Sequence, residues 1–248
     1  MLDQLFALFL VVLFPLYNWN EARKVRRDIA GGLDPAKIDT AGDYRKGIAI
    51  LWAIGIAGVA LWLFQSRSWD ALGMGAGTDS ALRWAGGIAV AVAGLVLTHL
   101  QAAQLGRSED ARKQLLDQLG DLLFFLPKTK REFYLFKWLS LAAGVCEEIL
   151  YRGFLIWFIA SYLGILPAIL LSSLAFGVAH SYQGFSNAVQ TAIIGLWMAI
   201  LFWLTGSVWI PMVTHFLVDV IGGRMIYGVL SQDTRGPGGE QVAAPGEA

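Results

Sequence analysis

Long apolar runs separated by short polar stretches dominate the chain. The hydrocarbon core of a bilayer is crossed by about 20 apolar helical residues. Seven runs come close to this length, at residues 5–19, 47–64, 84–105, 138–160, 164–182, 188–205 and 208–230. The pattern therefore predicts an all-α, polytopic transmembrane helix bundle of about seven spans, of which the first is short.

Two segments outside these spans have patterns of their own. Residues 115–126 are apolar at helical spacing, but the run is too short and too interrupted to cross a bilayer. We expect an amphipathic helix in the membrane interface, ended by Pro127. Residues 231–248 are rich in Gly, Pro and Ala without an apolar stripe, so we expect a disordered tail. Residues 1–230 are then expected to form a single transmembrane domain.

The composition fits an integral, multi-pass membrane protein. Of the 248 residues, 56% are hydrophobic and 15% are charged, whereas about a quarter of a soluble domain is charged. The net charge is zero, so no overall field points to nucleic acid as a partner. Cys146 is the only cysteine in the sequence, which excludes an intramolecular disulfide and a cysteine-based metal cluster.

The basic residues predict the orientation in the bilayer. Fourteen Lys or Arg fall in the segments 20–46 and 106–137, and two fall in the segment 65–83. Because Lys and Arg are retained on the cytoplasmic side, we expect the N-terminus outside and the C-terminus in the cytoplasm. Asp3 precedes the first apolar run and the basic residues follow it. This order is opposite to that of a cleaved signal peptide, so we expect a retained first span.

The span 138–160 carries an unusual group of charges, Glu147, Glu148 and Arg152. Each costs roughly 3 kcal/mol to insert, and an ionisable residue inside a membrane marks a functional site by default. Glu148 and Arg152 are four positions apart on one helical face, which suits an ion pair. Glu147 is turned about 100° away and is free to face another group.

Two later spans carry histidines with a partner four residues away. These pairs are Phe176 with His180 and His215 with Asp219. A carboxylate one turn from a histidine is placed to accept its ring N–H and fix its tautomer. By depth, Glu147, His180 and His215 are expected to meet in the inner half of the bundle, in a cavity open to the cytoplasm.

Three motifs therefore occur in order, each in its own span: Glu147-Glu148-x-x-x-Arg152, Phe176-x-x-x-His180 and His215-x-x-x-Asp219. This order resembles that of the CPBP family of intramembrane proteases, over roughly residues 138–222. The family includes endopeptidases for prenylated CaaX proteins and bacterial relatives in bacteriocin processing or immunity. The resemblance implies an endopeptidase of the bacterial inner (cytoplasmic) membrane that cleaves a membrane-anchored protein or peptide near the cytoplasmic face.

The resemblance also implies a role for each motif residue. Glu147 would be the general base that activates water, and His180 would bind and orient that water. His215 and Asp219 would stabilise the oxyanion. Because CaaX endopeptidases carry Asn where this chain has Asp219, and an ionised Asp cannot donate a hydrogen bond, Asp219 is expected to buttress His215.

Three residues have supporting roles in this interpretation. Glu148 and Arg152 would hold the helix in place as an ion pair, and Phe176 would shape the pocket by packing. Without the resemblance, the same residues can be interpreted as a buried structural ion pair, an interfacial histidine and a structural His–Asp pair between helices.

Alternatives remain for the chemistry and for the function. Glu147, His180 and His215 could bind Zn²⁺ with one open position, but this would leave no separate base, so we expect no metal and no other cofactor. A non-catalytic binding or immunity protein would keep the cavity and sequester a peptide or partner. A small transporter is a weaker alternative, because broken helices in two symmetric halves are missing from the sequence. The sequence does not indicate the oligomeric state.

Overall fold

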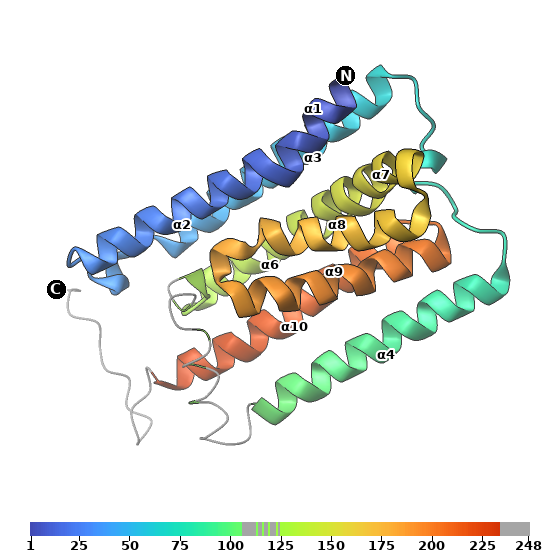
Figure 1. The fold of residues 1–248 in the computed structure, drawn as a ribbon. Coiled ribbons are helices and arrows are strands. Elements are labelled where there is room, and N and C mark those ends of the chain that lie inside the picture. The colour runs from blue at the N-terminus through green and yellow to red at the C-terminus, as the bar shows by residue number, and fades with distance from the viewer. Residues whose placement is uncertain (106–112, 114–115, 117–118, 120–122, 124, 234–248) are drawn as a thin grey trace.

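The computed structural model describes residues 1–105, 113, 116, 119, 123 and 125–233 of the chain. Within these ranges the regular structure is helical, and the long helices run side by side as an elongated bundle (Figure 1). The longer segments are α1 (Leu2–Leu8), η1 (Phe9–Leu13), α2 (Phe14–Ala30), α3 (Thr40–Phe64), α4 (Ala81–Leu105), α6 (Lys130–Glu147), η5 (Glu148–Leu155), α7 (Ile156–Leu163), α8 (Ile165–Ala179), α9 (Phe185–Thr205) and α10 (Trp209–Asp233). Short 3₁₀ turns are η2 (Pro35–Lys37), η3 (Asp70–Leu72) and η6 (Ser181–Gln183).

These segments form seven helical rods in the described ranges, because α1, η1 and α2 are continuous, as are α6, η5 and α7. Each predicted span falls on one rod, so the prediction of an all-α polytopic bundle is confirmed. Among the described residues, five helices are long and apolar enough to cross a membrane: Leu2–Ala30, Thr40–Phe64, Ala81–Gln104, Phe185–Thr205 and Trp209–Leu230. The other two rods are the shorter apolar helix Ile165–Ala179 and the charge-bearing rod from Lys130 to Leu163.

The first helix is longer than the sequence pattern predicted. Residues 20–30 were expected to belong to a basic loop, but the helix continues unbroken to Ala30. The segment is rich in Glu, Ala, Arg and Lys, which are strong helix formers, and Glu21 pairs with both Lys24 and Lys46. Helical propensity and these ion pairs therefore extend the helix beyond its apolar part.

Two further sequence expectations concern segments that are only partly described. Most of the predicted amphipathic helix at 115–126 lies outside the described residues. In the predicted tail 231–248, residues 231–233 continue α10 as helix, so that boundary was wrong. Residues 234–248 lie outside the described part of the chain.

The rod from Lys130 to Leu163 lies within the bundle, in contact with both α3 and α10. A capping box starts it, since the Thr129 hydroxyl accepts from the Glu132 amide and the Glu132 carboxylate accepts from the Thr129 amide. Small residues allow close packing along it. A Cβ added at Gly55 of α3 would lie 2.8 Å from the Cys146 sulfur, and one at Gly144 would lie 3.0 Å from the Met212 carbonyl oxygen of α10.

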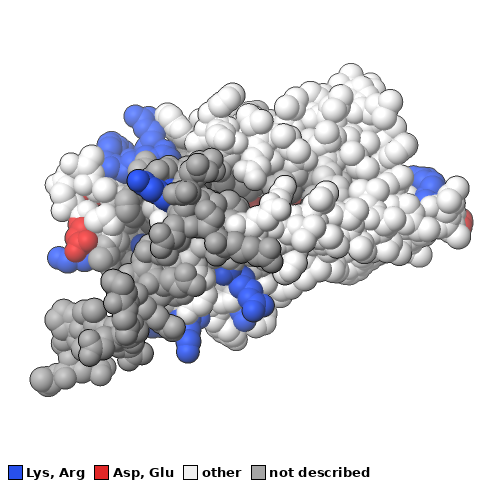
Figure 2. Space-filling model, turned by 90° about the horizontal axis from the view of Figure 1, so that it is seen from below, with Lys and Arg blue, Asp and Glu red and all other residues white. Residues whose placement is uncertain are grey.

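The surface of the bundle is charged mainly near its ends. The face in Figure 2 carries most of its Lys and Arg toward one end, with a wide band that has almost no charge. Leu97, Val92, Ile193 and Leu174 are among the large apolar side chains exposed on the sides of the helices. Such a surface suits lipid contact, and the chain is accordingly an integral membrane protein. The inside and outside assignment stays a prediction.

Candidate active site

The Glu-Glu motif lies at a change in helix type. α6 ends at Glu147, and Glu148–Leu155 form an eight-residue π-helix in which every residue is buried. The Ser172 hydroxyl of α8 donates to the Tyr151 carbonyl oxygen at 2.8 Å and attaches this segment to the neighbouring helix. π-Helical turns within α-helices occur frequently at functional sites. The sequence analysis assumed the α-helical period of 100° per residue, so it did not predict this π-helical segment.

Glu148 and Arg152 form the ion pair that their spacing predicted. Arg152 Nη1 donates to Glu148 Oε1 at 2.9 Å, and the two side chains are 1% and 0% exposed. Arg152 Nη2 also donates to the Gly195 carbonyl oxygen of α9 at 3.0 Å. The guanidinium carbon stacks 4.4 Å from the centre of the Phe176 ring. Both charges are therefore partnered inside the bundle, as buried charges require.

The histidine of α10 is attached to this pair and not to its own helical neighbour. His215 Nδ1 donates to Glu148 Oε1 at 2.7 Å, whereas Asp219 Oδ2 lies 3.8 Å from the other ring nitrogen, Nε2. That distance is too long for a hydrogen bond. The expectation that Asp219 accepts the ring N–H and fixes the tautomer was wrong. Close contact of α6 and α10 at Gly144 lets Glu148 reach the Nδ1 edge, while Asp219 faces the Nε2 edge.

The Nε2 edge of His215 faces two carboxylates across short gaps. Glu147 Oε2 lies 3.9 Å away and Asp219 Oδ2 lies 3.8 Å away. Both distances are too long for a direct hydrogen bond, so this ring edge is not bonded directly to either carboxylate. Side-chain exposure rises from 8% at His215 to 13% at Glu147 and 32% at Asp219. The site therefore opens on the Asp219 side, toward the C-terminal end of α10.

His180 is the residue that ends α8. Its Nδ1–H donates to the Phe176 carbonyl oxygen at 2.8 Å. Because a carbonyl only accepts, this bond leaves Nε2 as the nitrogen available to other groups.

Phe176 is the wall shared by the two histidines. Its ring centre lies 4.7 Å from that of His180 and 6.0 Å from that of His215. The ring of Tyr151 meets it edge-on at 5.1 Å. Residues of all three motifs therefore pack around the Phe176 ring.

The described residues do not include a group of three His, Cys, Asp or Glu side chains arranged to hold one metal ion. Nδ1 of His215 and Nδ1 of His180 are both engaged in hydrogen bonds. The set considered for zinc, Glu147, His180 and His215, would therefore have to bind through the two Nε2 atoms and the Glu147 carboxylate.

Sequence reasoning missed several contributors to this site. They are the Gly195 carbonyl, the Ser172 hydroxyl and the ring of Tyr151. The Gly195 carbonyl and the Ser172 hydroxyl are uncharged groups outside the motifs. The only indication for Tyr151 in the sequence is its position on the same helical face as Glu147. His99 is exposed on α4 and belongs to none of the three motifs.

Comparison with known proteins finds a match for the motif-bearing segment of the chain. Residues 129–221 match the family model described as Rce1-like, type II CAAX prenyl endopeptidase. No curated protein and no solved structure matches the chain. The matched segment starts at the capping residue Thr129, includes all three motifs and ends two residues after Asp219. Over this segment the chain is similar to the Rce1-like CAAX protease family, in agreement with the resemblance of its motifs.

Proposed function

We propose that this protein is an intramembrane endopeptidase of the glutamate type. Its substrate would be a membrane-anchored protein or peptide, cleaved near the cytoplasmic face. The strongest support is the geometry at His215, where one ring edge is anchored to Glu148 and the other faces Glu147 and Asp219 across 3.9 and 3.8 Å. The match of residues 129–221 to a protease family model supports the reaction class.

Glu147 is the proposed general base. A water bound beside Glu147 Oε2 and Nε2 of His215 would give a proton to the carboxylate and attack the carbonyl carbon of the scissile bond. The tetrahedral intermediate would then collapse as the C–N bond breaks, with Glu147 returning the proton to the leaving amine. The products are a carboxylate and an amine, so one water is consumed for each bond cleaved.

His215 and His180 are the proposed stabilisers of the oxyanion and the water. The bond from Nδ1 of His215 to Glu148 fixes the ring, and Arg152 fixes Glu148 in turn. Donation from Nε2 of His215 to an oxyanion requires a proton on that nitrogen. The nearby Glu147, Glu148 and Asp219 carboxylates favour such a cationic ring electrostatically. A donor fixed before the reaction pays little reorganisation cost in the transition state.

Asp219 and Phe176 have supporting parts in this proposal. Asp219 would stabilise the protonated His215 and contact the water in the Nε2 gap, since an ionised carboxylate donates no hydrogen bond. Phe176 would keep both histidine rings in position. We propose that neither a metal nor another cofactor takes part, with zinc held by Glu147, His180 and His215 as the alternative.

The site would open to the cytoplasm in the proposed orientation. Asp219, its most exposed carboxylate, lies one turn beyond His215 toward the C-terminal end of α10. The same end of the bundle holds the segments 20–30 and 128–137, which are rich in Lys and Arg. The positive-inside rule assigns that end to the cytoplasm.

The reaction class is tested with the purified protein in liposomes and a panel of peptides. The panel contains a farnesylated CaaX peptide, the same peptide without the lipid, and a single-span peptide. In water enriched in ¹⁸O, mass spectrometry should detect a cleaved product with one ¹⁸O in its new carboxyl group. Binding of a probe without cleavage of any of them would favour the non-catalytic alternative.

A further inference from the structure

The helical extension of the first span reaches the turn that follows His180. α2 packs against α8 and against η6, the turn that leads from α8 to α9. Arg26 Nη2 donates to the Tyr182 carbonyl oxygen at 2.8 Å, although the two residues are 156 positions apart. The sequence pattern assigned residues 20–46 to a loop, so this contact was not foreseen.

The turn held by Arg26 shapes the surroundings of His180. The His180 carbonyl accepts from the Gln183 amide at 2.9 Å, and the Ser181 carbonyl accepts from the Gly184 amide at 3.0 Å. Gly184 then has a φ of 100° as α9 begins. The turn is thus short and sharply bent, and its Tyr182 carbonyl points to α2, where Arg26 supplies a charged donor.

The ring of Tyr182 links this turn to the imidazole. It stacks on the His180 ring with centres 6.2 Å apart and planes 29° apart. The Phe176 ring packs against His180 at 4.7 Å. The imidazole therefore has one aromatic neighbour that belongs to α8 and one that belongs to the turn. The second belongs to the residue whose backbone carbonyl accepts from Arg26.

We propose that Arg26 is a positioning residue for His180. By holding the Tyr182 carbonyl, Arg26 fixes the turn and the stacked ring that orient the imidazole. The N-terminal helix is then part of the framework of the site, although the family match begins at residue 129. The effect of Arg26 on catalysis rests on the proposed function, whereas its effect on the His180 ring does not.

The test uses the full-length protein with ¹⁵N-labelled histidine in detergent micelles. The sequence contains three histidines, His99, His180 and His215, so the imidazole signals can be assigned with His180→Gln and His99→Gln. Arg26→Gln should shift or broaden the His180 signals and leave those of His99 in place. Arg26→Lys should restore them in part, because an ammonium also donates to a carbonyl but lacks the planar fork.

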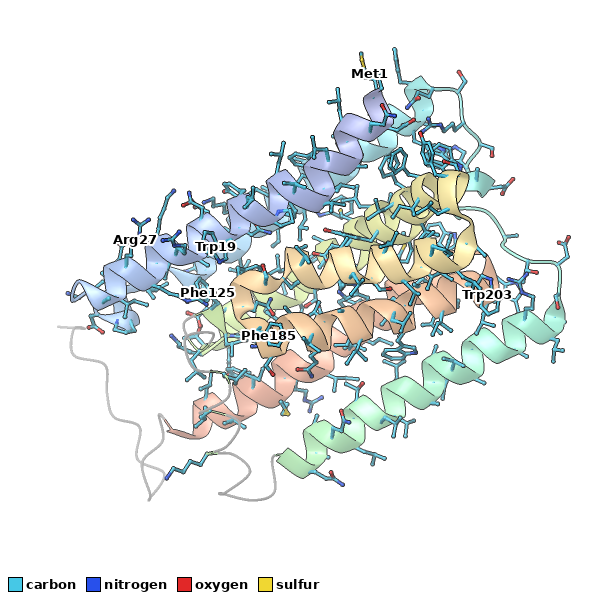
Figure 3. The ribbon with its side chains drawn as sticks, in the orientation of Figure 1. Met1, Trp19, Arg27, Phe125, Phe185 and Trp203 are labelled. Atoms are coloured by element: carbon cyan, nitrogen blue, oxygen red, sulfur yellow. The ribbon has the colours of Figure 1, made fainter. Side chains whose placement is uncertain are left out.

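Arg27→Gln is the matched control. It removes the same charge from the same helical turn, but Arg27 is exposed and its Nε donates to the Arg23 carbonyl within the helix. Figure 3 labels Arg27 and Phe185 at the same end of the bundle. This variant should leave all three imidazole signals unchanged. His180 signals that stay in place in Arg26→Gln would overturn the proposal.

Tyr182→Leu keeps the inference testable if Arg26→Gln fails to fold. It removes the stacked ring and retains the backbone carbonyl that accepts from Arg26. We expect it also to shift the His180 signals. Unchanged signals would show that the Tyr182 ring does not orient the His180 imidazole.

Proteolysis of the farnesylated peptide gives a separate readout. Arg26→Gln should lower kcat roughly 10- to 100-fold, as misplacement of a catalytic group does, with little change in KM. A wild-type protein that cleaves nothing, with His180 signals that still respond to Arg26→Gln, would refute the proposed function and leave the positioning role intact. Unaltered kcat in a folded Arg26→Gln variant would refute the catalytic part of the positioning role.

Discussion

Glu148 and His215, 67 positions apart in the chain, share a hydrogen bond of 2.7 Å inside the bundle. The acceptor oxygen, Glu148 Oε1, also accepts from Arg152 at 2.9 Å. One carboxylate oxygen therefore joins α10 to the π-helical segment and, through Arg152, to the backbone of α9. Glu147 is next to it in sequence and faces the opposite edge of the same imidazole.

Loss of Arg152 should strongly destabilise the fold. Arg152→Leu leaves the Glu148 carboxylate buried without its cation, which typically costs about 3–5 kcal/mol. We expect a large fall in the midpoint of thermal unfolding in detergent. Lys24→Ala, which breaks the exposed pair with Glu21, is the control and should change stability by about 1 kcal/mol or less. Equal melting of the two variants would show that the buried pair does not stabilise the bundle.

Substitution of His215 should separate the effect of its hydrogen bond to Glu148 from the effect of Nε2 on proteolysis. The Asn amide group occupies nearly the position of Nδ1, so His215→Asn can still donate to Glu148 but lacks Nε2. We expect near-normal unfolding with proteolysis lowered about 10²–10³-fold, the usual cost of losing an oxyanion donor. His215→Leu should lose both the hydrogen bond to Glu148 and the proteolytic activity, with a destabilisation of about 1–3 kcal/mol for the acceptor left unpaired. Full activity in His215→Asn would exclude a catalytic role for Nε2.

The close approach of α6 and α10 at Gly144 should also be required for stability and for proteolysis. A Cβ there would lie 3.0 Å from the Met212 carbonyl and 3.2 Å from the Phe216 amide, both backbone atoms that cannot rotate away. Gly144→Val should therefore push α10 outward, cost about 1–3 kcal/mol and reduce proteolysis. Gly222→Ala on α10 is the control, because nothing lies within 4 Å of its added Cβ. A Gly144→Val protein as stable and active as Gly222→Ala would contradict this packing.

Removal of metal ions should leave proteolysis unchanged if Glu147 is the base. Treatment with EDTA or 1,10-phenanthroline, followed by dialysis, is expected to preserve the initial rate with the farnesylated peptide. Loss of activity that Zn²⁺ restores would instead assign Glu147, His180 and His215 as ligands, with zinc activating the water.

The number and type of long helices could be predicted from the sequence, because each apolar run is long compared with its breaks. The ion pair of Glu148 with Arg152 also followed from spacing. These features depend on local periodicity and on the cost of charge in a membrane, both of which can be read along the chain.

The features that escaped prediction depend on contacts between distant segments. The partner of His215 is Glu148 and not Asp219, because the packing of α6 on α10 decides which carboxylate reaches Nδ1. The helix beyond residue 19 is mostly polar, and its contact between Arg26 and Tyr182 joins residues that are 156 positions apart. The π-helical segment breaks the α-helical period that the reasoning assumed.

The most direct measurement is the initial rate of peptide cleavage by the wild-type protein and Glu147→Gln in the same liposomes. Gln keeps the size and polarity of Glu but cannot take a proton, so we expect the rate to fall roughly 10²–10⁴-fold, the usual contribution of general acid–base catalysis. The unfolding midpoint should stay near that of the wild type, since Glu147 Oε2 makes no direct hydrogen bond to His215 at 3.9 Å. A Glu147→Gln protein that cleaves the farnesylated peptide at the wild-type rate would contradict the role of Glu147 as the base.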